Sequence, residues 1–221
     1  MRVLYLRPEG SEEPSLKGIE IINVPLFNVT CIPYDSSLLK GEGIAFTSVN
    51  AVRCFKDIGI LKFKRIFSIG PSTAKELERI GISSEVPERY TSRDLATLIL
   101  QSKVRSLTSV RSLRASQEMK HILSSISYTE IYDYDLTENH ENMEYAKDLL
   151  EDCSVDIVVL TSSLIATTVA KFIKDCHKVI TIGPMTSASL KLIRPDLRFI
   201  ESPVSTIEGT LNLIQELKGG E

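Results

Sequence analysis

The chain has 221 residues, of which 43% are hydrophobic and 25% are charged, and its formal net charge at pH 7 is −3. This length is sufficient for one large hydrophobic core or two small ones, and the composition is typical of a soluble globular protein. The small negative charge and the lack of long Lys/Arg runs argue against a protein that binds nucleic acid.

The N-terminal sequence MRVLYLRPEG has neither the apolar stretch nor the small-residue cleavage site of a signal peptide. The most apolar segment, residues 155–173, is interrupted by hydroxyl residues, which favours a buried strand and a helix over a membrane span. The four cysteines form no Cys-x-x-Cys pair and lie in apolar contexts; they are Cys31, Cys54, Cys153 and Cys176. We therefore expect reduced core cysteines in a cytoplasmic protein. The three scattered histidines predict no metal site.

Strands and helices are predicted to alternate along the whole chain. The predicted strands are residues 2–6, 19–29, 43–47, 65–69, 104–109, 131–137, 156–160, 178–182 and 198–201. The predicted helices are residues 49–57, 72–80, 92–102, 114–124, 140–151, 163–174, 185–192 and 206–217. Such alternation is typical of a parallel sheet with helices on its faces, so the sequence predicts the α/β class.

Three landmarks recur in the same order at an offset of about 114 residues, which chance rarely produces. The pairs are Thr47 in FTSVN with Thr161 in LTSSL, Gly70 in SIGPST with Gly183 in TIGPMT, and Thr91 in TSRD with Ser205 in STIE. The chain is therefore predicted to carry two related α/β modules.

The order of the predicted strands suggests that one module is discontinuous. The C-terminal half has no strand of its own before residue 140, whereas the N-terminal segment supplies two strands. The economical interpretation is one domain of residues 1–26 and 138–221, with residues 33–130 inserted as a second domain. Residues 27–32 and 131–137 would then cross between the domains as a two-stranded hinge.

Glycines and hydroxyl residues mark the predicted junctions between strands and helices. Ser48 opens a helix after Thr47, and Gly70 supplies a tight turn after which Thr73 is expected to cap the next helix, paired with Glu76. TSRD and STIE read as capping boxes, in which Thr91 pairs with Asp94 and Ser205 pairs with Glu208. A good helix start is a sufficient explanation for any one of these junctions.

The repetition of the junctions favours a binding site. In doubly wound sheets the strand-to-helix turns gather at the carboxyl edge, where ligands bind. Each helix N-terminus offers free N–H groups and about half a positive charge, which suits carboxylates or phosphates. Because the chain contains neither a Walker A sequence nor G-x-G-x-x-G, a polycarboxylate is favoured over a nucleotide.

Several motifs together resemble the uroporphyrinogen-III synthase family. They are YLRPEG, FTSVNAV, SIGPSTAKELERIG, VPERYTSRDLATLI, IYDYDL, LTSSLIA and TIGPMTSASL. The resemblance implies two flavodoxin-like parallel-sheet domains joined by a two-stranded β-ladder hinge, with the active site in the cleft between them. It implies a monomeric, cofactor-free hydro-lyase of tetrapyrrole and haem biosynthesis. Its substrate is hydroxymethylbilane, a linear tetrapyrrole with eight carboxylates, which it cyclises with loss of water and inversion of ring D.

Carried over by position, the resemblance also names site residues. The cleft would be lined by Arg7, Thr47, Ser48, Gly70, Ser72, Thr73, Thr161, Ser162, Ser163, Gly183, Met185 and Thr186. For Arg7, a surface arginine at a turn is an equally good interpretation. Met185 stands where the family usually has a hydroxyl.

The crossing segment EIYDYDL carries the tyrosine that the resemblance makes catalytic, Tyr132. A phenol with its ordinary pKa of about 10 is protonated at neutral pH and can donate to the departing hydroxyl. Strand alternation places Tyr132 and Tyr134 on the same face, so the pattern alone does not separate them. The alternative function is a non-catalytic binding or sensor module for a polycarboxylate on the same fold.

Overall fold

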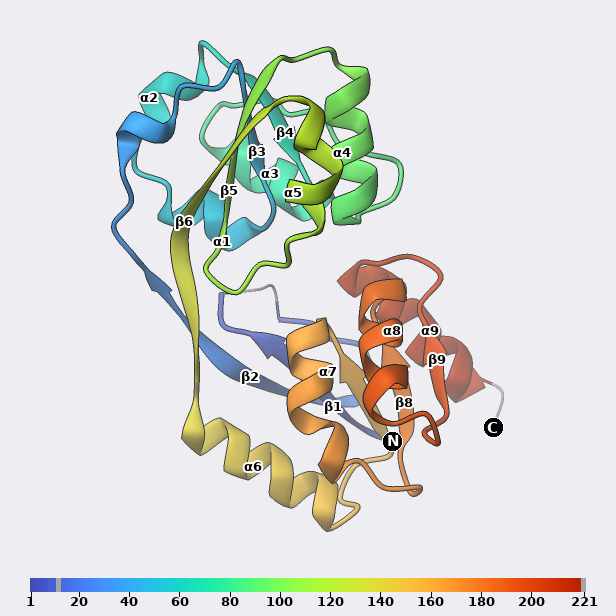
Figure 1. The fold of residues 1–221 in the computed structure, drawn as a ribbon. Coiled ribbons are helices and arrows are strands. Elements are labelled where there is room, and N and C mark those ends of the chain that lie inside the picture. The colour runs from blue at the N-terminus through green and yellow to red at the C-terminus, as the bar shows by residue number, and fades with distance from the viewer. Residues whose placement is uncertain (11–12, 220–221) are drawn as a thin grey trace. The chain divides into compact units, whose positions relative to one another are not determined.

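A computed structural model of the chain describes residues 1–10 and 13–219 (Figure 1). Its strands form a mostly parallel nine-stranded sheet with the hydrogen-bonded order β4-β3-β5-β6-β2-β1-β7-β8-β9. The strands are β1 (Arg2–Pro8), β2 (Glu20–Cys31), β3 (Gly43–Phe46), β4 (Arg65–Ser68), β5 (Ser106–Ser112), β6 (Ser127–Glu138), β7 (Ile157–Leu160), β8 (Lys178–Thr181) and β9 (Phe199–Glu201). The predicted α/β class is confirmed.

Helices follow most of the strands and cover the sheet faces (Figure 1). They are α1 (Val49–Cys54), α2 (Ile58–Leu61), α3 (Pro71–Arg79), α4 (Ser92–Gln101), α5 (Glu118–Ile122), α6 (His140–Glu151), α7 (Ser163–Val169), α8 (Pro184–Ile193) and α9 (Ile207–Gly219). Short 3₁₀ turns lie at Ser36–Leu38, Leu123–Ser125 and Ala170–Phe172. Within residues 1–10 and 13–219, no helix combines the length and apolarity needed to cross a bilayer.

The contacts of the chain divide it into two compact units, residues 1–28 with 137–221, and residues 29–136. β2 leaves the first unit and enters the second, whereas β6 makes the return passage. Both strands have twelve residues and the same sequence of buried and exposed positions. The two crossings are therefore structural counterparts, although their sequences share little.

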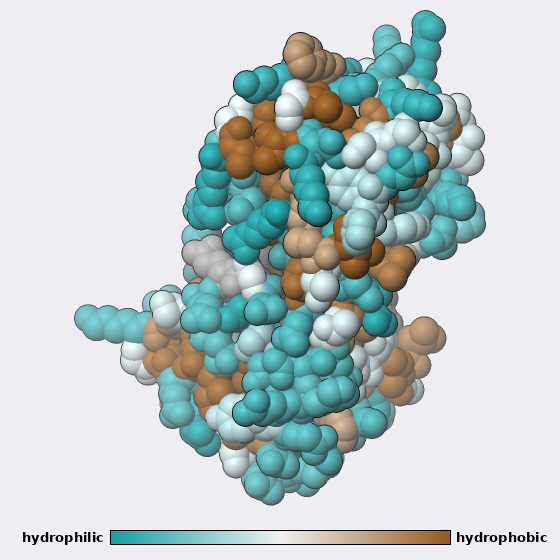
Figure 2. All heavy atoms as spheres, turned by 90° about the vertical axis from the view of Figure 1, so that its left-hand side faces the viewer, coloured by the Kyte–Doolittle hydropathy of each residue, from teal (hydrophilic) through white to brown (hydrophobic). Residues whose placement is uncertain are grey.

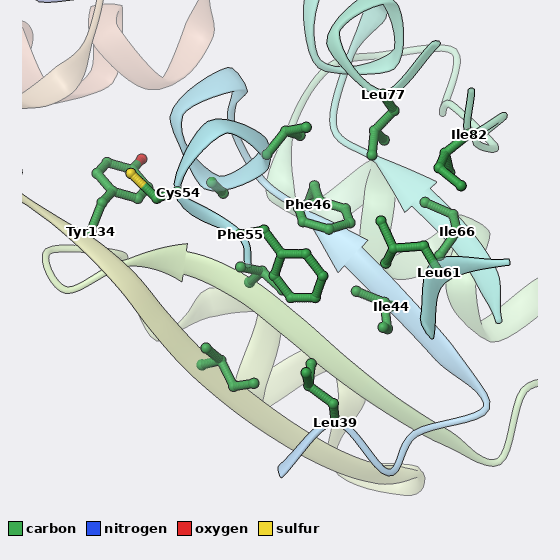
Figure 3. Packing of buried hydrophobic residues seen from close by; sticks show 14 residues of the cluster. Leu39, Ile44, Phe46, Cys54, Phe55, Leu61, Ile66, Leu77, Ile82 and Tyr134 are labelled. Atoms are coloured by element: carbon green, nitrogen blue, oxygen red, sulfur yellow. The ribbon is translucent and has the colours of Figure 1, made fainter. Parts of the chain in front are cut away.

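The unit of residues 29–136 has a hydrophobic cluster on each face of its strands. In one cluster, Phe46 of β3 packs edge-to-face on Phe55 at 5.2 Å between ring centroids (Figure 3). Tyr34 stacks against the same Phe55 ring, at 5.8 Å between centroids. The other cluster joins Phe67 to Leu95 and neighbouring residues of α4 and α5. Because both faces are covered, central strand β3 is buried at every position, as parallel strands usually are.

In the other unit, Tyr5 of β1 packs with Ile157 and Val159 of β7 and with Ile214 of α9. The Tyr5 hydroxyl lies 2.7 Å from Thr210 Oγ1, which satisfies the one polar group of this buried ring. Burial raises the pKa of Tyr5 to about 12, so this phenol is structural and neutral.

At the surface, Figure 2 shows hydrophilic side chains over most of the face drawn, with apolar atoms in separate patches.

The expectation of reduced cysteines is wrong, because all four form disulfides. Cys31 at the end of β2 is bonded to Cys54 at the end of α1, and Cys153 after α6 is bonded to Cys176 before β8. Each bond joins positions 23 residues apart that only the folded chain brings together. Each thereby closes a loop around one strand–helix unit, β3–α1 or β7–α7.

Candidate functional site

The helices that follow β3 and β7 begin in the same way in both units. Ser48 precedes α1, and its Oγ accepts a hydrogen bond from Ala51 N at 3.0 Å. Ser162 precedes α7, and its Oγ accepts from Ile165 N at 3.2 Å. The prediction that Ser48 opens a helix is confirmed. These caps satisfy one of the N–H groups that a helix start leaves free.

The threonines before these caps anchor neighbouring strands. Thr47 Oγ1 donates to Val110 O of β5 at 3.3 Å, and Thr161 Oγ1 donates to Leu6 O of β1 at 2.8 Å. In each unit, therefore, the hydroxyl is engaged by a backbone carbonyl. The residue that follows this carbonyl is an arginine in both cases.

These two strand-end arginines are buried, Arg7 at 5% and Arg111 at 2% exposure. Because Arg7 is buried, its interpretation as a surface arginine is wrong. Its guanidinium forms an ion pair with Glu13 at 2.6 Å. Arg111 forms an ion pair with Glu130 at 2.5 Å and donates to Ser116 O. Sequence analysis missed Arg111, although both arginines directly follow an apolar strand residue, in LYLRP and in TSVRS.

The helices after β4 and β8 start at glycines. Gly70 and Gly183 are the N-cap residues of α3 and α8, both helices have proline in the first turn, and neither has a side-chain cap. Proline suits this position because its missing N–H would be free there anyway. The backbone N–H groups that follow the prolines belong to Ser72 and Met185. No side chain of the N-cap residue accepts a hydrogen bond at these two helix starts. Such starts favour anions.

Thr73 does not cap α3, contrary to the prediction. It is the third residue of the helix, where it is 3% exposed, and its counterpart Thr186 in α8 is equally buried. The helix starts earlier than predicted because Gly70 and Pro71 form its first turn. Glu76, the expected capping partner, instead accepts hydrogen bonds from Arg53 of α1 and from Arg79, three residues further along α3.

The two predicted capping boxes have different outcomes. Thr91 caps α4 and accepts a hydrogen bond from Asp94 N at 3.1 Å, as predicted. Before α9, by contrast, Thr206 accepts from Gly209 N at 3.0 Å, so the cap lies one residue beyond the predicted Ser205. Ser205 instead packs against Gly183.

A polar cluster lies along β5 and β6 around the carboxylate of Glu130. Glu130 accepts hydrogen bonds from Tyr128 at 2.9 Å and Tyr132 at 2.7 Å, in addition to its ion pair with Arg111. Burial raises the pKa of Glu130, but the hydrogen bonds from Tyr132, Arg111 and Tyr128 lower it more, so the net pKa is below its ordinary value. The carboxylate is therefore ionised at neutral pH.

The Tyr132 phenol is held by this carboxylate. The hydrogen bond to Glu130 is the largest cause that raises the pKa of Tyr132, and burial adds to it. The phenol consequently keeps its proton throughout the neutral range. It is a proton donor that gives its proton only to a strong base.

Tyr132 and Tyr134 do not share a face, contrary to the prediction. The register of β5 with β6 shifts so that Arg111 pairs with Tyr132 while Ser112 pairs with Tyr134, which leaves Asp133 as the extra residue of a bulge. Tyr134 consequently packs in the cluster with Phe46 and Phe55 (Figure 3). Its hydroxyl lies 2.9 Å from Ser48 Oγ at the start of α1.

Asp133 is fully buried, and neither of its carboxyl oxygens has a hydrogen-bond partner among the described residues. Burial raises its pKa to about 8, so the side chain is largely neutral at pH 7. The corresponding position of β2 is Leu26, which is also fully buried. An ionisable group thus occupies a site that is apolar in the other crossing strand.

Comparison with known proteins identifies the family. The profile of uroporphyrinogen-III synthase HemD matches residues 12–211, most of the chain. The chain belongs to the uroporphyrinogen-III synthase family. None of the curated proteins compared with the sequence matched it.

Solved structures of similar proteins show the same fold. A mutant uroporphyrinogen III synthase from the extremely thermophilic bacterium Thermus thermophilus has a TM-score of 0.64 and 14% identity, with 100% of this chain and 99% of that chain covered. The uroporphyrinogen-III synthetase of Helicobacter pylori has a TM-score of 0.65 and 16% identity, with 98% and 100% covered. At these identities the likeness concerns the fold.

In this member of the uroporphyrinogen-III synthase family, the predicted site residues fall into two sets. The unit of residues 29–136 carries Thr47, Ser48, Gly70, Ser72, Thr73 and Tyr132. The other unit carries Arg7, Thr161, Ser162, Ser163, Gly183, Met185 and Thr186. Within each unit these residues gather near the carboxyl ends of parallel strands, where ligands bind in such sheets. Ser163 links two of the helix starts by donating to Met185 O at 3.0 Å.

The paired glycines give a matched test of close packing. A Cβ at Gly183 would lie 2.2 Å from Ser205 Oγ and 3.0 Å from Ser205 Cβ, whereas at Gly70 the nearest atoms, in Tyr90, are 3.3 Å away. Gly183→Ala should lower the free energy of unfolding by about 1–3 kcal/mol, and Gly70→Ala by less. Urea unfolding measures both. Adding Ser205→Gly should restore part of the loss, and equal losses at the two glycines would contradict this packing.

Asp133 should make the unfolding free energy depend on pH. Because its pKa is higher in the folded chain than in the unfolded one, the stability that Asp133 contributes is greatest in acid and is lost as pH rises from about 4 to about 8. The contribution is about 1.4 kcal/mol per pH unit in that window. Asp133→Asn should flatten the curve and be the more stable protein at pH 8. Urea titrations that give parallel curves for the two proteins would refute this assignment.

Proposed function

We propose that the protein catalyses the reaction of its family, in which hydroxymethylbilane loses water and closes to uroporphyrinogen III with ring D inverted. The observation that carries the proposal is the family match over residues 12–211. No cofactor is needed, because the pyrroles of the substrate supply the electrons that expel the hydroxyl. The proposal includes a monomer that acts in the cytoplasm.

The substrate's eight carboxylates would bind at helix starts. α3 and α8 begin at Gly70 and Gly183 without side-chain caps, and free N–H groups at such positions attract anions. Ser72 and Met185 are exposed residues in these first turns. The remaining predicted residues, including the buried Thr73 and Thr186, would shape these turns.

Both units carry such helix starts, so we propose that one substrate molecule binds to both. The units would then act as the two flavodoxin-like domains of the family, with residues 27–32 and 131–137 as a two-stranded hinge. This arrangement would hold the bilane folded for ring closure. Conformational control matters because the free bilane closes by itself without inverting ring D.

Catalysis would begin when the ring A hydroxyl leaves as water and an azafulvenium cation remains. The leaving group takes a proton from Tyr132, which at rest donates to Glu130. A phenol with a raised pKa keeps its proton until a base as strong as departing hydroxide is beside it. The substituted carbon of ring D then attacks, and the spiro intermediate fragments and closes again. The proton released on final aromatisation returns to the phenolate.

The direct test of the function supplies purified protein with freshly made hydroxymethylbilane and separates the products by chromatography. We expect the type III isomer in excess over a protein-free control. Type I alone, together with measurable binding of the bilane, would instead favour the non-catalytic binding module.

Tyr132→Phe should lower turnover by roughly 100-fold or more, the usual scale for a positioned proton donor. The ring remains, so the circular dichroism spectrum and melting temperature should change little. Tyr128→Phe is the matched control, because it removes the other phenol that donates to Glu130. We expect that control to retain most of the turnover. Near-wild-type formation of type III product by Tyr132→Phe would rule out the phenol as the acid.

A charge at the start of α8 should separate binding from stability. Thr186 is buried, so an aspartate there would disturb folding, whereas Met185 is 50% exposed in the same turn. Met185→Asp should raise KM severalfold by repelling substrate carboxylates, while the helix dipole keeps the melting temperature unchanged or slightly higher. Leu192→Asp adds the same charge near the other end of α8. Equal effects of both variants on KM would argue against anion binding at this helix start.

A further inference from the structure

Two cysteines and a histidine, none of them a predicted site residue, form a cluster in the unit that does not contain Tyr132. The sulfur atoms of Cys153 and Cys176 and a ring nitrogen of His177 all lie within 4.8 Å of one another. Among residues 1–10 and 13–219, this is the group that could offer three metal ligands. Both cysteines are exposed, whereas the histidine is buried.

The surroundings of His177 suit a metal ligand. Its Nδ1 lies 3.0 Å from Val155 O, and its Nε2 lies 3.0 Å from Leu150 O and 3.6 Å from Cys176 Sγ. A neutral imidazole has one N–H, so when Nδ1 donates to Val155 O, Nε2 carries the lone pair, and it would turn from Leu150 O to bind a metal ion beside the sulfur. Histidines that bind metals usually donate their other nitrogen to a carbonyl in this way.

Withdrawing Nε2 from Leu150 O would leave no orphaned carbonyl. Leu150 O also accepts from the backbone N–H of Asp152 and, at 3.4 Å, from that of Cys153. The carbonyl therefore stays paired at the end of α6 while the imidazole takes another partner. The cost of rearranging the site is small.

The backbone conformation of Cys153 also indicates that its side chain has a specific role. Its φ is 52°, in the left-handed region, directly after the C-cap residue of α6, Asp152. Glycine or asparagine is preferred at this position because a Cβ is strained there. A cysteine serves helix termination poorly, so the position is better explained by what its sulfur does.

We infer that Cys153, Cys176 and His177 form a thiophilic metal site, suited to Zn²⁺, when their disulfide is reduced. A dithiol reductant supplies two electrons and two protons to the Cys153–Cys176 bond and itself becomes a disulfide. The two thiols lose their protons as the ion binds, Nε2 is the third ligand, and water fills the fourth position. Sulfur and imidazole ligands select Zn²⁺ over Mg²⁺ or Ca²⁺.

The site would keep one cross-link under two redox conditions. The disulfide joins the end of α6 to the start of β8 in an oxidising medium, and the metal ion would join the same segments in a reducing one. The Cys31–Cys54 bond also spans 23 residues, but it belongs to no such group among the described residues. It is therefore the internal control.

The test uses the full chain with Cys31→Ser and Cys54→Ser, so that one cysteine pair remains. A phosphine reductant opens that pair, and Co²⁺ is titrated as a coloured substitute for Zn²⁺. We expect one equivalent of Co²⁺ with a near-ultraviolet thiolate-to-cobalt absorption band, displaced by one equivalent of Zn²⁺. The oxidised protein should bind neither ion.

Matched variants assign the ligands. Adding Cys153→Ser or His177→Gln should weaken binding by more than about 100-fold, beyond the usual cost of losing a residue that only supports a ligand. The complementary chain, with Cys153→Ser and Cys176→Ser, should bind no ion although it keeps Cys31 and Cys54. Binding that survives these changes, or a folded reduced protein without the absorption band, would overturn the inference. If reduction unfolds the chain, Zn²⁺ must restore its circular dichroism spectrum, and failure to do so would also overturn it.

Discussion

The carboxylate of Glu130, whose side chain is 9% exposed, holds together the part of the molecule on which the proposed chemistry depends. It pairs with Arg111 of β5, whose side chain is 3% exposed, and accepts hydrogen bonds from the phenols of Tyr128 and Tyr132. Removing one member of a buried ion pair leaves an uncompensated charge, which costs about 3–5 kcal/mol. The network therefore ties the end of β5 to β6 and holds the Tyr132 phenol at rest.

Comparison of the two repeats shows how the half that contains Glu130 differs from the other half. Arg7 and Arg111 follow equivalent strand residues, but the side chain of Glu13, which pairs with Arg7, is 74% exposed, whereas that of Glu130, which pairs with Arg111, is 9% exposed. The β2 counterpart of Tyr132 is Pro25, which has no proton to donate. The two halves thus share their helix starts and differ in their crossing strands. Anion binding is proposed for both halves, and proton transfer for one.

Local patterns were sufficient to predict much of the architecture. Alternating apolar runs and helical segments gave the α/β class, and Ser48 and Thr91 were correctly identified as caps because capping depends on a few adjacent residues. Thr73 was misplaced because a glycine and a proline can begin a helix without a side-chain cap. The one-residue error at Ser205 has another cause, because two adjacent hydroxyl residues, Ser205 and Thr206, were both possible caps.

Features set by distant partners could not be read from the sequence. The separation of Tyr132 from Tyr134 depends on a bulge opposite β5, which alternation within one strand does not reveal. The burial of Arg111, the burial of Asp133 and both disulfides depend on segments that meet only in the folded chain. Folding changes the properties of these residues most, since burial raises the pKa of Asp133 and the four cysteines become disulfides.

The central claim is that Glu130 acts through the Tyr132 phenol, and a double-mutant cycle on turnover tests it most directly. Type III product formation would be measured for the wild type, Glu130→Gln, Tyr132→Phe and the double variant, each corrected for its folded fraction. If Glu130 serves to position the phenol, Glu130→Gln should slow the wild type strongly but change the Tyr132→Phe protein by less than about twofold, since coupled residues are not additive. Equal fold-losses from Glu130→Gln in both backgrounds would contradict the account.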